Sequence, residues 1–327
     1  MTKIIALGNA LVDVMTMLPN DSVLEELNLP KGSMQLVDAE TSKKIQNFTD
    51  NFSKSIASGG SSANTIRSLA NLGVSTGFVG KICDDEMGKF FAEDMKRTGV
   101  FPHLKKSKTP TGVAQALVSP DSERTFATFL GAASELIPDD ISDLTFKGFD
   151  ILHIEGYLIF NNELIEKALI SAKNAGLKVS LDLASYNIVE ANLDFLKYLI
   201  DKYVDIVFAN EEEAKAFTGK EPEQALDMIS SMCEIAIVKI GAEGSLVKRA
   251  NEREAVGAIK AKPIDTTGAG DNYAAGFLYG LINNWDLRRC AQAGSILAGN
   301  VIEVIGATMD EKRWNKIKEE ISQLKNN

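Results

Sequence analysis

The segment Asp265-Thr-Thr-Gly-Ala-Gly-Asp271 combines an anion-binding turn with an acid–base group. Its glycines allow a sharp turn, so that the N–H groups of Gly268, Ala269 and Gly270 would point out of the start of a predicted helix, NYAAGFLYGLI. Asp271, in the first helical turn, could accept the proton of a hydroxyl that attacks a phosphoryl group held there. A single Asp at this position can also serve only to complement the helix dipole. The complete string favours phosphoryl transfer.

Asn9 and Asp13 form a second polar pair, in the segment GNALVD that directly follows the first predicted strand. An amide and a carboxylate at this spacing could hydrogen-bond two adjacent hydroxyls of a ribose or a hexose. An Asx turn is the alternative for Asn9, but it explains less well why Asp13 stands among apolar residues. The pair therefore favours a polyhydroxylated ligand.

The string DTTGAGD resembles the C-terminal signature of the PfkB (ribokinase-like) family of carbohydrate and nucleoside kinases, and the resemblance covers nearly the entire chain. It implies that Asp271 is the catalytic base and that the backbone of residues 268–270 forms an anion hole. It also implies ATP as the phosphoryl donor, together with Mg²⁺. Asp265 and the carbonyl of Thr267 resemble the ligands of a monovalent cation in many relatives, so the resemblance also allows K⁺.

Ser58-Gly-Gly-Ser-Ser-Ala-Asn64 looks like the N-terminal signature of the same family. The resemblance implies that Gly59 and Gly60 let a sugar approach the backbone and that Asn64 hydrogen-bonds its hydroxyls, as Asp13 does. Glycines ahead of a capped helix are also ordinary turn residues. The sugar-binding interpretation of this segment therefore depends on the presence of the other motifs.

Two further motifs resemble the family's nucleotide site: Asn-Glu-Glu-Glu at 210–213, which is similar to a motif that helps to organise Mg²⁺ and the phosphates, and VKIGAEGS, which falls where the family has a nucleotide-contacting loop. The residues implied are Asn210, Glu213, Lys239, Gly241 and Gly244. Asn210 and Glu213 could instead simply cap a helix. The chain departs from many relatives at Lys239, where Thr is common, and at Ser295, where Asn or His often lies near the adenine.

The acceptor substrate is less strongly indicated. GNALVD, the hairpin around Arg124 and the segment IEGYL look closest to adenosine kinases. A nucleoside base needs an apolar slot, which could be formed by Leu11, Phe129, Leu130, Tyr157 and Leu158, although any one of them is more readily explained as a core or lid-packing residue. The leading expectation is a kinase that phosphorylates the hydroxymethyl group of a ribonucleoside or related sugar. A fructose-type hexose kinase and a catalytically silent nucleoside or sugar sensor remain alternatives.

Two other nucleotide-binding classes are disfavoured. A dinucleotide oxidoreductase would need GxGxxG after a strand, whereas the first predicted strand is followed only by Gly8. A Walker-type NTPase would need a glycine loop that ends in Gly-Lys and Ser or Thr, which the chain lacks.

The elements that must position these residues alternate between short apolar runs and segments of helical period. This rhythm predicts an α/β fold with a mostly parallel sheet, and the resemblance implies a ribokinase-like three-layer α/β/α domain. The predicted strands are 3–7, 76–79, 151–154, 179–183, 206–209 and 235–240, and helices are expected at 61–72 and 163–175. Residues 14–37 and 111–130 break the rhythm, the latter as a hairpin around SPDSE. We expect these two segments to form a small β lid, and residues 1–13, 38–110 and 131–327 the main domain.

Composition excludes several classes of partner. The 327 residues carry a formal net charge of −10 and no run of Lys and Arg, which disfavours nucleic acid. Three scattered cysteines suggest neither a disulfide framework nor a zinc site. The N-terminal segment resembles no signal peptide and no apolar run could cross a membrane, so a cytoplasmic protein is expected. The expected partner is a small-molecule substrate, and exposed lid edges also allow a homodimer.

Overall fold

The computed structural model describes residues 2–121 and 123–326, and within them the strands form two sheets. The larger sheet contains β1 (Lys3–Leu7), β5 (Ser75–Cys83), β6 (Val100–Ser107), β9 (Ile151–Glu155), β10 (Lys178–Asp182), β11 (Ile206–Asn210), β12 (Ile235–Lys239), β13 (Ser245–Arg249) and β14 (Glu252–Val256). Its order is β14-β13-β12-β11-β10-β9-β1-β5-β6. All neighbours from β12 to β6 pair in parallel, and only β13 and β14 are antiparallel. The predicted mostly parallel sheet is confirmed.

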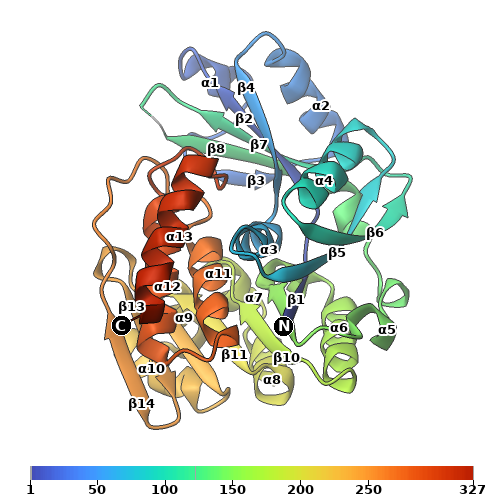
Figure 1. Ribbon diagram of the computed structural model, residues 1–327. Helices are drawn as coiled ribbons and strands as arrows, with labels where there is room; N and C mark the ends of the chain where they lie inside the picture. Colours follow the sequence, from blue (N-terminus) through green and yellow to red (C-terminus); the bar gives the residue numbers. More distant parts are fainter. Residues whose placement is uncertain (1, 122, 327) are drawn as a thin grey trace.

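Helices cover both faces of this sheet (Figure 1). One face packs against α3 (Ser61–Asn71), α4 (Glu86–Arg97), α11 (Ala269–Ile282), α12 (Leu287–Val301) and α13 (Glu311–Asn326). The other packs against α5 (Asp143–Phe146), α6 (Asn162–Asn174), α7 (Tyr186–Ala191), α8 (Leu193–Tyr203), α9 (Glu211–Thr218) and α10 (Pro222–Ser230). In β1, Ile4 and Ala6 point to the first layer while Ile5 and Leu7 point to the second. A strand buried on both faces reads as a continuous apolar run, as this one does.

The smaller sheet lies beside one end of the larger sheet (Figure 1). It contains β2 (Leu11–Met17), β3 (Met34–Leu36), β4 (Lys54–Gly59), β7 (Gly112–Val118) and β8 (Arg124–Phe129), in the order β3-β8-β7-β2-β4. Two helices, α1 (Ser22–Glu26) and α2 (Ala39–Phe48), pack on it through a separate apolar cluster. The predicted hairpin is confirmed by the antiparallel pairing of β7 with β8, although residue 122 of its turn lies outside the described residues.

The expected lid segments, 14–37 and 111–130, differ from this sheet at two places. β2 begins already at Leu11, and β4 at 54–59 belongs to the sheet as the antiparallel partner of β2. The first three residues of β4 are exposed and its last residues are Ser and Gly, so the segment lacks the apolar alternation that identifies a strand in a sequence. Only pairing with β2 makes it a strand.

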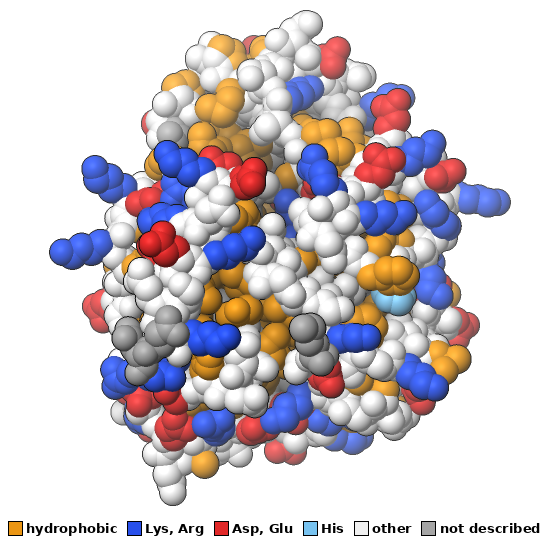
Figure 2. All heavy atoms as spheres, in the orientation of Figure 1, with side chains coloured by type: hydrophobic (Ala, Val, Ile, Leu, Met, Phe, Trp, Pro, Cys, Tyr) orange, Lys and Arg blue, Asp and Glu red, His pale blue; other side chains and the backbone are white. Residues whose placement is uncertain are grey.

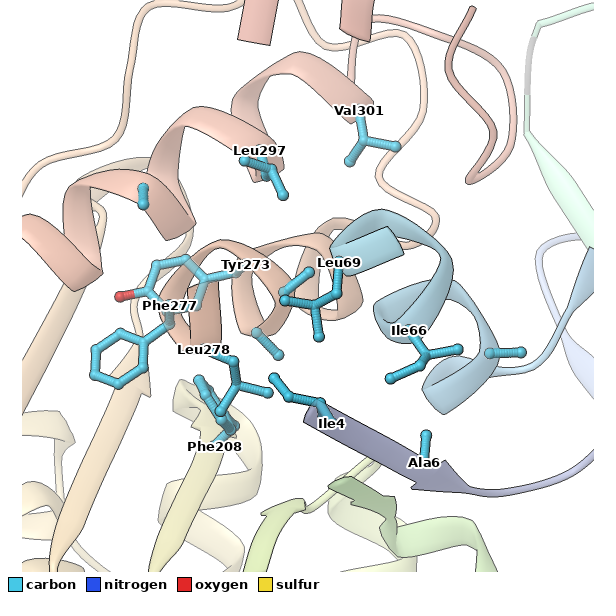
Figure 3. Packing of buried hydrophobic residues seen from close by; sticks show 14 of the residues in the cluster. Ile4, Ala6, Ile66, Leu69, Phe208, Tyr273, Phe277, Leu278, Leu297 and Val301 are labelled. Carbon is cyan, nitrogen blue, oxygen red and sulfur yellow. The ribbon is translucent and has the colours of Figure 1, made fainter. Parts of the chain in front are cut away.

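The helix that begins with the DTTGAGD turn is held by one of the largest packed regions of the core. Figure 3 shows side chains of α3, α11 and α12 converging on β1 and β11. The ring of Phe277 stands edge-on to that of Phe208, with centroids 5.6 Å apart. Each such buried side chain contributes about 1.5–3 kcal/mol to folding, so the start of α11 is fixed relative to the sheet. None of the helices within the described residues is long and apolar enough to span a bilayer.

Candidate active site

A cavity of about 1360 Å³ opens at the carboxyl ends of the parallel strands, between the two sheets and the start of α11. Each central strand contributes a polar residue at or just after its end: Asn9 (β1), Glu155 (β9), Asp182 (β10), Asn210 (β11) and Lys239 (β12). Ligands bind at this edge in open α/β sheets. Of the predicted site residues, all but Gly59 and Asp265 line the cavity.

Asp271 lies at the centre of the site, in the first turn of α11. Ser61 Oγ donates to Asp271 Oδ1 at 2.7 Å, and Asn64 Nδ2 donates to Oδ2 at 3.0 Å. Burial raises the pKa of Asp271 to about 7, while these two hydrogen bonds oppose that increase. A carboxylate with a pKa near neutrality is suited to accept a proton from a substrate hydroxyl.

The turn before Asp271 has one amide fewer available than the sequence predicts. Gly268 adopts the left-handed φ of +73° that the turn requires. The N–H of Ala269 donates to the carbonyl of Thr266 at 3.1 Å, which closes the turn. The amides of Gly268 and Gly270 have no acceptor among the described residues, and both glycines line the cavity. Of the three predicted donors, these two amides remain available to bind an anion.

Lys239 adds a positive charge to this turn. A Cβ placed on Gly270 would lie 3.0 Å from Lys239 Nζ, so the ammonium stands directly beside the turn. Lys239 Nζ also donates to Asp182 Oδ2 at 2.9 Å, and both side chains are largely buried. Burial alone would lower the pKa of Lys239, but the charges of Asp182 and Glu213 raise it above its ordinary value. Lys239 is therefore a fixed cation next to the predicted phosphate site.

The backbone directly after β10 holds the carboxylate of Asp182 in position. Ala184 has a φ of +69°, which is unusual for a residue with a Cβ. In this conformation its N–H donates to Asp182 Oδ1 at 3.0 Å. Each carboxylate oxygen of Asp182 is thus engaged, one by Ala184 and one by Lys239. Unusual backbone conformations tend to occur at functional sites, because the surroundings must support their cost.

Asp13 marks the other end of the cavity, on β2 of the small sheet. Its carboxylate accepts no hydrogen bond from the residues that the structure describes, and burial raises the pKa of Asp13 to about 7 against the opposing charge of Arg67. A Cβ on Gly59 would lie within 2.1 Å of the Asp13 carboxylate, so only glycine fits behind it. A half-buried carboxylate that lines a cavity and has no protein partner is poised to accept hydrogen bonds from ligand hydroxyls.

A buried network holds the floor between these two ends. Glu155 Oε1 accepts from the backbone N–H of Asn9 at 2.9 Å and from its Nδ2 at 2.6 Å. Glu155 Oε2 accepts from Ser62 N and from Ser62 Oγ, both at 2.9 Å. Burial nevertheless raises the pKa of Glu155 above its usual range. The side-chain amide of Asn9 is thus engaged by Glu155, so Asn9 contributes to the site first by fixing its shape.

The start of α3 also differs from expectation. Neither Ser61 nor Ser62 caps the helix, because Gly60 is the N-cap residue and the two hydroxyls bind Asp271 and Glu155 instead. Asn64, expected to contact the substrate, donates to Asp271, while its Oδ1 is buried without a partner among the described residues. That oxygen remains available to a ligand hydroxyl.

Apolar side chains wall the end of the cavity that contains Asp13, which is the expected acceptor end: Leu11, Met34, Leu36, Ala114, Phe126, Leu130, Leu136, Tyr157, Leu158 and Phe160. Four of the five residues expected to form an apolar slot line the cavity. The fifth, Phe129, does not, and Phe126 of the same strand lines the cavity instead. Side chains alternate along β8, so residues 126 and 129 face opposite sides. Lys239 is the one Lys or Arg among the described residues that line the cavity.

Asn210 and Glu213 form the reciprocal cap of α9. Glu213 N donates to Asn210 Oδ1 at 2.8 Å, and Asn210 donates back through N to Oε2 at 2.8 Å and through Nδ2 to Oε1 at 2.7 Å. Burial raises the pKa of Glu213 to about 7. The capping alternative is thus realised. Because both carboxylate oxygens are engaged, these residues fit a Mg²⁺ ion held mainly by nucleotide phosphates and water.

Gly241 begins a single 3-10 turn after β12 and Gly244 ends it, and both line the cavity together with Ser295, Ala298 and Gly299 of α12. These small residues leave room beside Lys239, away from the apolar acceptor end, because β12 is separated from β1 by three strands. Within the described residues, no group of three or more His, Cys, Asp and Glu side chains could hold a metal ion. On the face shown in Figure 2, basic and acidic side chains are interspersed.

Three site residues were not predicted to act there: Asp182, Ser61 and Glu155. Asp182 and Glu155 each end an apolar strand run, VSLD and ILHIE, and a charged residue at that position is a usable signal in a parallel sheet. Nothing local distinguishes Ser61 from the helix cap it resembles, because its partner lies 210 residues away.

The chain is similar to a known family and to several known proteins. A family model described as pfkB family carbohydrate kinase matches residues 34–313. A probable sugar kinase from Rhizobium etli is 32% identical, with 99% of both chains covered and a TM-score of 0.88. An adenosine kinase from Sinorhizobium meliloti is 33% identical, with 98% of this chain and 99% of the other covered and a TM-score of 0.87. A 5-dehydro-2-deoxygluconokinase from Geobacillus kaustophilus is 29% identical, over 75% of this chain and 78% of its own.

Proposed function

Because this chain belongs to the pfkB family of carbohydrate kinases and is a sugar or nucleoside kinase, we propose that it transfers the γ-phosphoryl group of ATP to the 5-position hydroxymethyl group of a ribonucleoside such as adenosine. The observation that carries the proposal is the position of Asp271. Its carboxylate lies between a turn that offers two amides and one ammonium and a cavity end that has a largely apolar wall and contains Asp13 and Glu155.

In this mechanism Asp271 accepts the proton of the attacking hydroxyl, while Ser61 and Asn64 hold its carboxylate in place. The amides of Gly268 and Gly270 and the ammonium of Lys239 stabilise the charge on the transferred phosphoryl group. ATP would extend from this turn towards Gly241, Gly244 and Ser295, and Mg²⁺ would neutralise its phosphates. Asn210 and Glu213 would help to hold that ion through bound water molecules.

Two features of the acceptor end support a ribonucleoside. Asp13 offers a desolvated carboxylate that can accept hydrogen bonds from two neighbouring hydroxyls, as a ribose presents. The apolar wall that surrounds it would be poorly matched to a free sugar, whose surface is polar on all sides, but it suits the faces of a purine or pyrimidine base.

A sugar acid is the second candidate, because several relatives are named 5-dehydro-2-deoxygluconokinase. The charges of the cavity disfavour it. A gluconate-type acceptor carries a carboxylate, whereas the acceptor end presents Asp13 and Glu155, and the one basic residue among the described lining, Lys239, stands at the phosphate end. An acceptor carboxylate would therefore lie beside two carboxyl groups and away from this ammonium, which is electrostatically unfavourable.

The test is an assay of ADP release with adenosine, other ribonucleosides, ribose, fructose and 5-dehydro-2-deoxygluconate at equal concentrations. We expect a ribonucleoside to give the highest kcat/KM, and a preference for the sugar acid would contradict the proposal. Asp271→Asn should abolish most turnover without loss of folding. Asp286→Asn, at the N-cap of α12, is the matched control for a helix-capping Asp and should retain turnover. Ligand binding without any ADP release would identify a sensor instead.

A further inference from the structure

Arg124 of the small sheet forms a buried ion pair with Asp265, the first residue of the DTTGAGD turn. The side chains are only 9% and 5% exposed. The same guanidinium nitrogen donates to the hydroxyl of Thr267. One arginine thus joins β8 to the turn that carries the anion-binding amides, across a sequence separation of 143 residues to Thr267.

The carboxylate of Asp265 is fully engaged by these surroundings. Its Oδ1 accepts from the backbone N–H of Thr267 at 2.9 Å as well as from Arg124, and its Oδ2 accepts from the backbone N–H of Gly306 at 2.5 Å. Three chain segments therefore meet at one carboxylate: β8, the anion-binding turn, and the loop between α12 and α13.

These contacts do not fit the monovalent cation expected at Asp265 and Thr267. A cation there would have to displace the guanidinium, or else share a buried carboxylate whose single negative charge Arg124 already balances. An uncompensated charge in such a place is costly. Within the described residues, no group of three or more His, Cys, Asp and Glu side chains that could hold a metal ion is present here or elsewhere.

We propose that Arg124 is a tethered cation that takes the place of a monovalent metal ion, orders the anion-binding turn from the small sheet, and makes the enzyme independent of K⁺. Arg124 is a positioning residue in this proposal, because it acts on the turn through Asp265 and Thr267. Its role in turnover rests on the proposed phosphoryl transfer, whereas its occupation of the cation position does not. Arginine suits this role since it is always charged and its planar group can bind two acceptors at once.

The test measures the thermal unfolding midpoint in K⁺, Na⁺ and tetramethylammonium chloride at equal ionic strength, which needs neither substrate nor activity. The wild-type midpoint should be the same in all three salts. Arg124→Ala should unfold roughly 5–10 °C lower in tetramethylammonium and recover part of that loss in K⁺. Arg253→Ala is the matched control, since it removes an exposed arginine from a surface ion pair on β14 and should show no K⁺ response.

Two results would overturn the proposal: a K⁺-specific increase in the wild-type midpoint, or an Arg124→Ala protein that folds but gains nothing from K⁺. If Arg124→Ala does not fold, Arg124→Lys replaces it. This variant keeps a tethered positive charge, so its unfolding midpoint should not depend on K⁺. A K⁺-specific increase in that midpoint would contradict the proposal. Where turnover is measurable, K⁺ should raise the rate of Arg124→Ala and leave that of the wild type unchanged.

Discussion

The hydroxyl of Ser61 donates a hydrogen bond of 2.7 Å to the carboxylate of Asp271, and so joins the first turns of α3 and α11. The two helices pack side by side, and α3 also packs on β1 (Figure 3). The proposed base is therefore fixed by the other signature motif of the chain. Such a contact favours the ionised carboxylate, whereas burial favours the protonated form.

The first prediction concerns pH. Burial raises the pKa of Asp271 to about 7, and only the ionised form can accept a proton, so kcat/KM for the acceptor should increase with pH and level off above about 7. Ser61→Ala removes a hydrogen bond that favours ionisation and should shift this increase to higher pH. The check is a pH–rate profile of both proteins between pH 5 and pH 9. A profile that is flat across this range in the wild type would argue against Asp271 as the base.

The raised pKa has an opposite effect on folding. Because the native state of Asp271 holds its proton up to about pH 7 and the unfolded state loses it near 3.8, the stability contributed by this group is present below pH 3.8 and is lost as pH rises to 7. Asp271→Asn should therefore be more stable than the wild type at pH 8 while being inactive. Urea unfolding at pH 5 and pH 8 measures the difference.

Lys239 is predicted to act on the transferred phosphoryl group. Lys239→Met should lower kcat by about 10²–10³, the usual loss when one donor to a developing charge is removed. The variant leaves Asp182 buried without its ammonium partner, so Asp182→Asn with Lys239→Met should restore folding but not turnover. Single-turnover measurements separate the chemical step from ATP binding. A normal kcat in Lys239→Met would remove this lysine from the mechanism.

Asp13 is predicted to bind the acceptor and not the nucleotide. Asp13→Asn should raise KM for the acceptor roughly 10–100-fold, because hydrogen bonds to a charged group are each worth about 1.5–3 kcal/mol. KM for ATP should stay unchanged, since Asp13 lies on the small sheet. Asp50→Asn, on the exposed segment after α2, is a suitable control. Equal changes in both KM values would point to a distorted site.

The ion pair between Arg67 and Asp94, which lies next to the segment that contains Gly59 and Gly60, is predicted to stabilise the fold. Arg67 and Asp94 form a buried ion pair with an N–O distance of 3.6 Å, and Arg67 Nη1 donates to the carbonyl of Ser58 at 2.7 Å. Asp94→Ala leaves Arg67 buried and unpaired and should cost about 3–5 kcal/mol of unfolding free energy. Arg97→Ala removes the exposed partner of Asp94 and should cost at most about 1 kcal/mol. Denaturant unfolding of both variants gives the comparison.

Several elements could be predicted because their cause is local. β1 is an uninterrupted apolar run, and its predicted bounds, 3–7, are those observed. The predicted helices at 61–72 and 163–175 are followed by Gly73 and Gly176, and both glycines adopt the positive φ that ends a helix. β4 could not be predicted in this way, because its exposed residues and its glycine become a strand only by pairing with β2.

For the site, the sequence by itself determined the chemistry of individual groups. The glycine turn, the Asp that follows it and the small residues of α11 are properties of neighbours in the chain, and local sterics decide them. The tertiary structure alone decided which partner each group has. Asp271 with Ser61, Lys239 with Asp182, and Arg124 with Asp265 are pairs from distant segments. Their free energy comes from burial and from charge in a low-dielectric interior, which exists only once both sheets and their helices have assembled.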